Sequence, residues 1–116
     1  MNRGDIVLLF VPFVGSRGGK TRPAVVVQCD ALNRSIRETV IAEITSNISR
    51  AGKAHQVFID ISTHEGAATG LLTNSVIRCE RLHTVPQSDV KATIGALSTA
   101  HHQMLNDALK AALAIR

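Results

Sequence analysis

The stretch Pro23-Ala24-Val25-Val26-Val27-Gln28-Cys29 is a near-continuous apolar run that directly follows a glycine-rich basic loop. A short run of this kind, rich in β-branched residues, predicts a strand buried on both faces of a sheet. Residues 6–10, extendable to residue 13, form a second apolar run, and residues 38–45 (ETVIAEIT) alternate as a strand does. The first part of the chain is therefore predicted to form a β-sheet.

The remaining sequence adds further strands and then changes character. Strands are predicted at 56–61, 75–79 and 81–85, with a turn at 30–35, a polar loop at 46–54 and a loop or brief helical turn at 62–70. Ser88-Asp89 can cap a short helix to residue 97, and Ser98 a longer one to residue 115. Apolar residues recur at helical spacing in the longer one, at Met104, Leu105, Ala108, Leu109, Ala112 and Leu113.

Strands followed by helices, without βαβ alternation, predict a mainly β fold: a small antiparallel barrel or half-barrel with a docked C-terminal α-helix. The length of 116 residues fits a single domain spanning 1–116. Three Phe are the sole aromatic residues, so we expect an aliphatic core and no base-stacking platform. Cys29 and Cys79 lie in apolar runs and are predicted to be small buried side chains of strands.

Charge and hydropathy indicate the class of partner and the compartment. Thirteen Lys and Arg against nine Asp and Glu give a formal net charge of +4, which suits a polyanion such as RNA or an acidic peptide. No apolar run is long enough to span a membrane and the N-terminus lacks a signal sequence. We therefore expect a cytoplasmic protein that does not bind membranes.

The loop at residues 15–22 is the first candidate site. Gly19-Lys20-Thr21 resembles the end of a nucleotide-binding P-loop, but Val14 occupies the position of the first glycine and a strand follows where a helix is required. A solvated turn and an anion-binding loop remain as alternatives. Arg22 favours the second, because a planar guanidinium beside Pro23, at the entry of a buried strand, suits a phosphate.

The sequence indicates no metal site and no cofactor. His101 and His102 would point about 100° apart on a helix, which disfavours chelation of one ion, and we expect them on a solvated helix face. The nine acids are dispersed, without pairs suited to two-metal catalysis, and no Ser-His-Asp or Cys-His arrangement can be recognised. A nuclease built from these residues would work without a divalent ion.

In their order and spacing, the segments resemble the MazF/PemK family of type II toxins over almost the whole chain. The matching segments are Arg3-Gly4-Asp5-Ile6, Gly15-Ser16, Gly19-Lys20-Thr21-Arg22-Pro23-Ala24-Val25-Val26-Val27-Gln28, Asp30, Asn33, Ile41-Ala42-Glu43-Ile44-Thr45-Ser46, Ser75-Val76-Ile77, Leu82-His83-Thr84-Val85 and Ile94-Gly95-Ala96-Leu97-Ser98. The resemblance implies an SH3-like or plasmid-toxin barrel and a homodimer. It also implies an mRNA interferase, a metal-independent endoribonuclease that cleaves single-stranded RNA and is neutralised by a cognate antitoxin with an acidic tail.

The resemblance also implies roles for individual residues. Arg22 matches the catalytic arginine and Thr45 the catalytic threonine. Such enzymes use the RNA 2′-hydroxyl as nucleophile and leave a 2′,3′-cyclic phosphate and a 5′-hydroxyl. Arg22 would stabilise the negative charge and is a candidate proton donor to the leaving oxygen, and Thr45 would orient the phosphate. The residues expected to bind RNA are Ser16, Arg17, Lys20, Thr21, Ser46, Arg81 and His83.

Two departures from the family pattern leave parts of the mechanism open. Arg17 replaces a Glu common in relatives, which leaves the general base open, and Arg81 replaces a Gln near the base-reading groove, which leaves the cleavage motif open. Two other functions remain as alternatives: a gyrase-inhibiting toxin similar to CcdB, and an inactive relative that binds RNA. The sequence does not identify the antitoxin.

Overall fold

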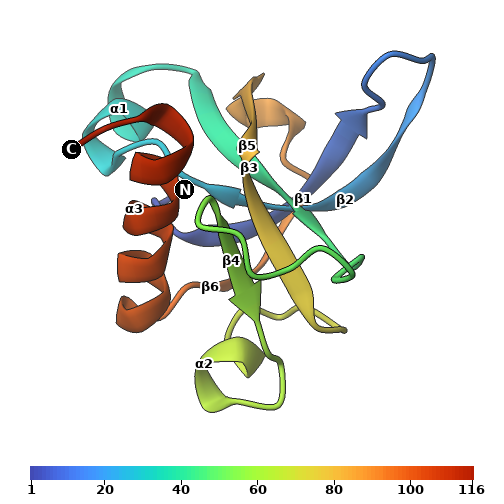
Figure 1. Ribbon diagram of the computed structural model, residues 1–116. Helices are drawn as coiled ribbons and strands as arrows, with labels where there is room; N and C mark the ends of the chain where they lie inside the picture. Colours follow the sequence, from blue (N-terminus) through green and yellow to red (C-terminus); the bar gives the residue numbers. More distant parts are fainter.

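The computed structural model describes residues 1–116 and consists of a six-stranded sheet with helices around it (Figure 1). Its elements in chain order are β1 Asp5–Pro12, β2 Gly19–Val26, α1 Asp30–Ser35, β3 Glu38–Thr45, β4 Gln56–Ile59, α2 His64–Ala67, β5 Ser75–Pro86, the 3-10 helix η1 Gln87–Asp89, β6 Ala92–Ala96 and α3 Thr99–Leu113. The strand order is β4-β5-β3-β2-β1-β6, and every neighbouring pair is antiparallel.

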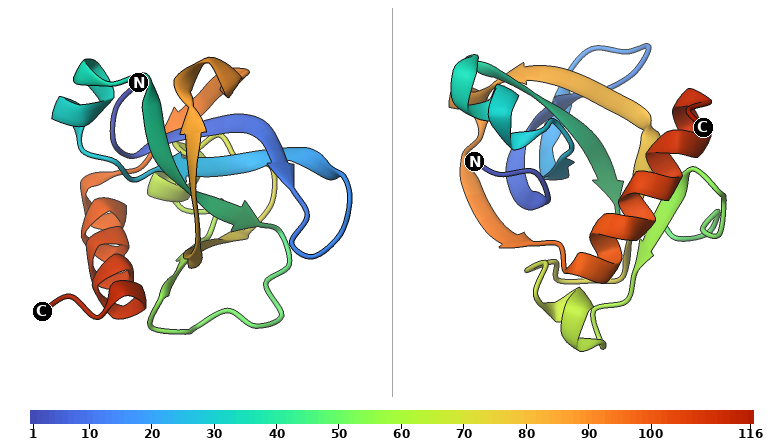
Figure 2. Two further views of the ribbon diagram at one scale, coloured as in Figure 1. Left: turned by 90° about the horizontal axis from the view of Figure 1, so that it is seen from above. Right: turned by 90° about the vertical axis from the view of Figure 1, so that its left-hand side faces the viewer.

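The sheet curls strongly, and α3 lies alongside β4 and β5 (Figure 2). This arrangement confirms the predicted mainly β fold, a half-barrel with a docked C-terminal helix. The long strand β5 makes the curl possible, because it pairs with β4 through its first half and continues beyond β4 along β3. No helix is both long and apolar enough to cross a membrane.

The central strands are buried on both faces, as the apolar runs predicted. On one face, Ile6 and Val25 belong to a cluster of 12 buried residues that α3 completes with Leu105 and Ala108. The other face carries a second cluster, made of Val7, Leu9, Val11, Ala24, Val26 and Ile41. Because neighbouring residues of a strand point to opposite faces, a strand in this position needs apolar residues throughout its length.

The predicted helix at 88–97 is wrong. After η1, residues 92–96 form β6, which pairs with the outer edge of β1. The free edge of β1 offers backbone hydrogen bonds to this segment, which cannot be predicted from the local sequence. In addition, Gly95 lets the backbone of Ala68 and Thr69 approach so closely that a Cβ atom at this position would collide with it. Tertiary pairing therefore decides the structure of this segment.

Three other sequence expectations need correction. Residues 19–22, expected in the glycine-rich loop, form the first half of β2 and pair with β1, and this strand ends at Val26 rather than at Cys29. Residues 30–35 form the short helix α1 rather than a turn, and Cys29, expected inside a strand, is the exposed residue before α1. Cys79 is buried as expected, and burial raises the pKa of its thiol to about 11.

Helix α3 begins as predicted, because the Ser98 side chain accepts a hydrogen bond from the His101 backbone N–H at 3.2 Å. Its buried face differs from the predicted stripe, since Met104 and Leu113 are half exposed. His101, expected in solvent, is instead buried, and its Nδ1 has no hydrogen-bond partner. Burial lowers the pKa of His101 below its ordinary value of 6.5, an effect that the charge of Glu65 partly opposes.

The buried imidazole of His101 should make the fold less stable in acid. Because burial lowers the pKa of His101 in the folded state, the folded chain binds a proton there less readily than the unfolded chain, whose histidine has its ordinary pKa of 6.5. The unfolded state therefore binds more protons as the pH falls through this range. The variant His101→Leu should therefore lose less free energy of unfolding between about pH 7 and pH 5.5 than the wild type does. Urea unfolding, followed by circular dichroism at fixed protein concentration, measures the difference.

The matched control is His64→Leu, because His64 is exposed. That variant should show the pH dependence of the wild type. An equal fall in stability for His101→Leu and the wild type would contradict the assignment.

Candidate functional site

Arg22 lies in the first half of β2, where this strand pairs with β1 alone, and Thr45 is the last residue of the neighbouring strand β3. Strand β2 pairs with β3 so that Ala24 faces Glu43, and the same register continued outward would set Arg22 opposite Thr45. The ladder ends at Ala24, and a pocket of about 460 Å³ opens where the two strands separate. Both residues line this pocket, which we call the arginine pocket.

The arginine pocket is formed by residues of β1, β2, β3 and β6 and of the segment that leads into β5. Its lining residues are Leu8, Lys20, Thr21, Arg22, Pro23, Ile44, Thr45, Ser46, Gly70, Leu71, Leu72, Thr73, Ser75 and Ile94. It therefore contains five of the residues predicted for the site: Lys20, Thr21, Arg22, Thr45 and Ser46. Lys20 and Arg22 bring positive charge to the pocket, and it holds no acid, so it suits an anion.

Arg22 is held by a buried acid that the sequence analysis did not single out. Its Nη1 donates to Oε1 of Glu43 at 3.4 Å, and Glu43 is 3% exposed. The second carboxylate oxygen, Oε2, lies 2.6 Å from Nε2 of His83 on β5. Residues two apart in a strand point to the same face, so Arg22 shares a face with Ala24, which pairs with Glu43. Ile41 shares that face with Glu43 and pairs with His83. All three side chains therefore lie on one face of the sheet. We call this group the Arg-Glu-His cluster.

The remaining donors of Arg22 are not used within the chain. Its Nε is buried and has no hydrogen-bond partner, and the guanidinium makes no hydrogen bond other than the one to Glu43. A buried donor without a partner is costly and points to a ligand that completes its bonding. The carboxylate fixes one corner of the planar group and leaves the rest for an anion.

A second pocket, of about 470 Å³, lies on the other side of Thr45. It is lined by Thr45, Asn47, Ser49, Arg50, Lys53, His55, Gln56, Val76, Arg78 and Glu80. Because Thr45 lines both pockets, they adjoin along the end of β3. We call this second hollow the basic pocket, since three Arg and Lys residues face one acid in it.

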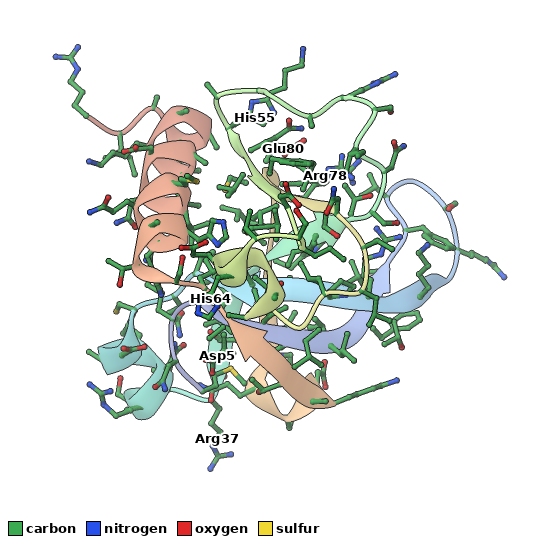
Figure 3. All side chains as sticks on the ribbon, turned by 90° about the horizontal axis from the view of Figure 1, so that it is seen from below. Asp5, Arg37, His55, His64, Arg78 and Glu80 are labelled. Atoms are coloured by element: carbon green, nitrogen blue, oxygen red, sulfur yellow. The ribbon has the colours of Figure 1, made fainter.

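Glu80 connects two basic side chains on one side of the basic pocket. Glu80 Oε2 lies 3.6 Å from Nε of Arg78 and 3.8 Å from Nε2 of His55. Figure 3 shows these three side chains side by side. These three side chains were not predicted to form a site, although the charged residues inside and after the apolar run at 75–79 indicate a polar patch on this strand.

The other predicted residues lie outside both pockets. Ser16 and Arg17 are exposed in the loop between β1 and β2, which projects from the body of the molecule (Figure 1). Arg81 belongs to a bulge of β5, where the register on β3 shifts from Leu82 to Arg78. His83 reaches the site through Glu43. No group of three or more His, Cys, Asp or Glu side chains could hold a metal ion.

Known proteins resemble this chain in sequence and in fold. The family model for PemK-like, MazF-like toxins of type II toxin–antitoxin systems matches residues 2–113. The chain is 30% identical to endoribonuclease MazF of Staphylococcus saprophyticus over 99% of this chain and 92% of that protein. It is also 30% identical to endoribonuclease EndoA of Bacillus subtilis over 99% of this chain and 96% of that protein.

Solved structures share the fold. A mycobacterial endoribonuclease in complex with its cognate antitoxin superposes with a TM-score of 0.79 at 18% identity, covering 100% of this chain and 97% of the other. The toxin MazF-mt6 of Mycobacterium tuberculosis gives 0.73 at 23% identity, covering 95% and 98%. With the full-length family match and two relatives named as endoribonucleases, the chain belongs to the family of PemK-like, MazF-like endoribonuclease toxins of type II toxin–antitoxin systems.

Proposed function

We propose that this toxin cleaves single-stranded RNA without a metal ion, with Arg22 and Thr45 as its catalytic residues. The observation that carries the proposal is the position of both side chains in one pocket, where the strands β2 and β3 separate. An RNA phosphate in this pocket would lie between the free donors of Arg22 and the hydroxyl of Thr45. Without a metal, the nucleophile is the 2′-hydroxyl of the RNA itself.

The chemistry follows from charge. Attack of the 2′-oxygen on phosphorus forms a crowded phosphorane with more negative charge than the phosphodiester, and the bond to the 5′-oxygen then breaks. The products are a 2′,3′-cyclic phosphate and a 5′-hydroxyl. Arg22 stabilises the added charge because its planar donors are fixed before the reaction. The Thr45 oxygen accepts from the Asn47 backbone N–H at 3.1 Å, which leaves its own proton to donate to the phosphate.

The two adjoining pockets support a path for the RNA strand. One nucleotide would lie in the arginine pocket, beside Lys20, Thr21 and Ser46, and the next in the basic pocket. Arg50, Lys53 and Arg78 would neutralise the backbone phosphates there. Ser16, Arg17, Arg81 and His83 stay proposed RNA contacts at the borders of this path.

Two kinds of protein partner belong to the same proposal. Relatives have been solved with their antitoxins, including MazE-MazF of Deinococcus radiodurans, and an acidic antitoxin segment would be attracted to the basic pocket of this chain. A second copy of the chain would cover apolar side chains such as Phe10, Phe13 and Val14, which are 44–68% exposed. Light scattering tests for this homodimer. As an enzyme acting on mRNA, the toxin would work in the bacterial cytoplasm.

Substitution of Arg22 tests the catalytic assignment. In excess EDTA, wild-type protein should cut single-stranded RNA, and Arg22→Ala should lower kcat by about 10²–10³-fold, as loss of one transition-state donor does. Arg22→Lys keeps the charge but loses the planar fork, and should also be strongly impaired. Gel assays of a labelled RNA measure the rates, and circular dichroism checks the fold.

Arg34→Ala, which removes an exposed cation of α1 remote from both pockets, is the control and should cut at the wild-type rate. Full activity of Arg22→Ala would remove the mechanism. If the wild type binds RNA but does not cleave it, the chain is an inactive relative. If it inhibits gyrase and does not cleave RNA, it is a gyrase-inhibiting toxin similar to CcdB.

The chemistry of the products gives an independent test. Fragments downstream of the cut should carry 5′-hydroxyl ends, which a polynucleotide kinase labels without prior phosphatase treatment. A 2′-deoxynucleotide at the cleaved position should abolish cutting there, because the nucleophile is missing. Mapping the labelled ends also gives the recognised sequence. Phosphate at the 5′ ends would mean that water, and not the 2′-hydroxyl, attacks phosphorus.

A further inference from the structure

Glu43 is a buried acid to which the cleavage mechanism above gives no role other than holding Arg22. Its side chain is 4% exposed, and its neighbours in the second cluster, Ala24 and Ile41, are fully buried and apolar. An ionised carboxylate is expensive to bury unless charged and hydrogen-bonding partners surround it. A residue that served only to pack the core here would be apolar. The buried carboxylate of Glu43 therefore indicates that its negative charge has a function.

The two oxygens of this carboxylate have different partners. Oε1 accepts from Nη1 of Arg22 at 3.4 Å, and Oε2 pairs with Nε2 of His83 at 2.6 Å. A single carboxylate thus holds the cation from β2 and the imidazole from β5 side by side. The other charged residue that faces Glu43 from across the ladder is Arg78, also on β5, which pairs instead with Glu80.

The hydrogen bond to Glu43 decides which imidazole nitrogen can act. An ionised carboxylate only accepts, so Nε2 of His83 carries the proton and donates it. In the neutral ring Nδ1 is then an acceptor, and it makes no hydrogen bond within the chain. A quarter of the side chain is exposed, on the face of the sheet that Arg22 shares. A base oriented by a carboxylate through its other nitrogen is the arrangement that general-base catalysis requires.

We propose that His83 is the general base of RNA cleavage and that Glu43 is the positioning residue that holds both His83 and Arg22. Nδ1 of His83 takes the proton of the 2′-hydroxyl as the 2′-oxygen bonds to phosphorus. The bond from phosphorus to the 5′-oxygen breaks, that oxygen takes a proton from water, and the imidazolium returns its proton to solvent. This inference rests on the cleavage mechanism proposed above. It names a general base, which was left open because Arg17 stands where relatives commonly have a Glu.

The decisive variant is His83→Gln. A glutamine amide can still donate to Glu43, which keeps Arg22 in place, but it cannot take up a proton. Single-turnover cleavage of an RNA oligonucleotide that contains the mapped site should slow by about 10²–10⁴-fold, a far larger loss than the loss of RNA affinity. The fall in the wild-type rate at acid pH, where the base becomes protonated, should disappear. Imidazole added to the buffer should restore part of the activity of His83→Ala, which a structural role would not permit.

Glu43→Gln tests the link between the two residues. If Glu43 acts through His83, this substitution should cost less in the His83→Gln background than in the wild type, as a double-mutant cycle measures. Equal losses in both backgrounds would overturn the link. Thermal unfolding of each variant, together with the affinity for uncleavable 2′-deoxy-substituted RNA, separates lost catalysis from lost structure.

The outcomes distinguish this inference from the proposed function. A wild-type rate and pH profile for His83→Gln, together with an inactive Arg22→Ala, would overturn the assignment of the base and leave Arg22 catalytic. If the wild-type chain leaves RNA intact, both proposals fail. Loss of activity in both variants, with rescue of His83→Ala by imidazole, is the expected result.

Discussion

The antiparallel pairing of β2 with β3 is the constraint on which the rest of the site depends. Ala24, Val25 and Val26 are fully buried and point alternately into the two clusters, so a slip of one residue would turn every one of them to the wrong face. This fixed register determines where the ladder ends, and Arg22 and Thr45 follow directly outside it. The buried residues 24–26 of β2 therefore position the functional residues, although their own side chains are apolar.

Much of the fold could be predicted because its signals are local. The apolar run after Arg22 predicts a strand buried on both faces, and Ser98 with the helical spacing after it predicts α3 and its start. Signals that depend on distant partners were misread. Residues 92–96 become a strand because β1 offers an unpaired edge, and His101 is buried although its neighbours in sequence are polar.

The site could be predicted in part for the same reason. Arg22 stands out beside Pro23 at the start of a strand, and the family resemblance supplies Thr45. Glu43 does not stand out, because in an alternating strand an acid is expected to face water. Only the folded chain explains it, since its partner His83 is 40 residues away and Arg22 is 21 residues away. The basic pocket was missed because it combines a loop, β4 and β5, which no single motif connects.

Charge connects the Arg-Glu-His cluster to the proposed chemistry. With Arg22 positive, Glu43 negative and His83 neutral, the cluster carries no net charge before the reaction, so the buried acid does not repel an incoming phosphate. When His83 takes the 2′-hydroxyl proton, the cluster becomes positive at the moment when the phosphorane gains negative charge. The stabilisation therefore grows along the reaction rather than at binding, and only an interaction that strengthens toward the transition state accelerates the chemical step. A positive side chain in place of Glu43 would make the cluster positive already at binding and could accept no hydrogen bond from Arg22 or His83, which is a physical reason for an acid at the centre of an RNA-cleaving site.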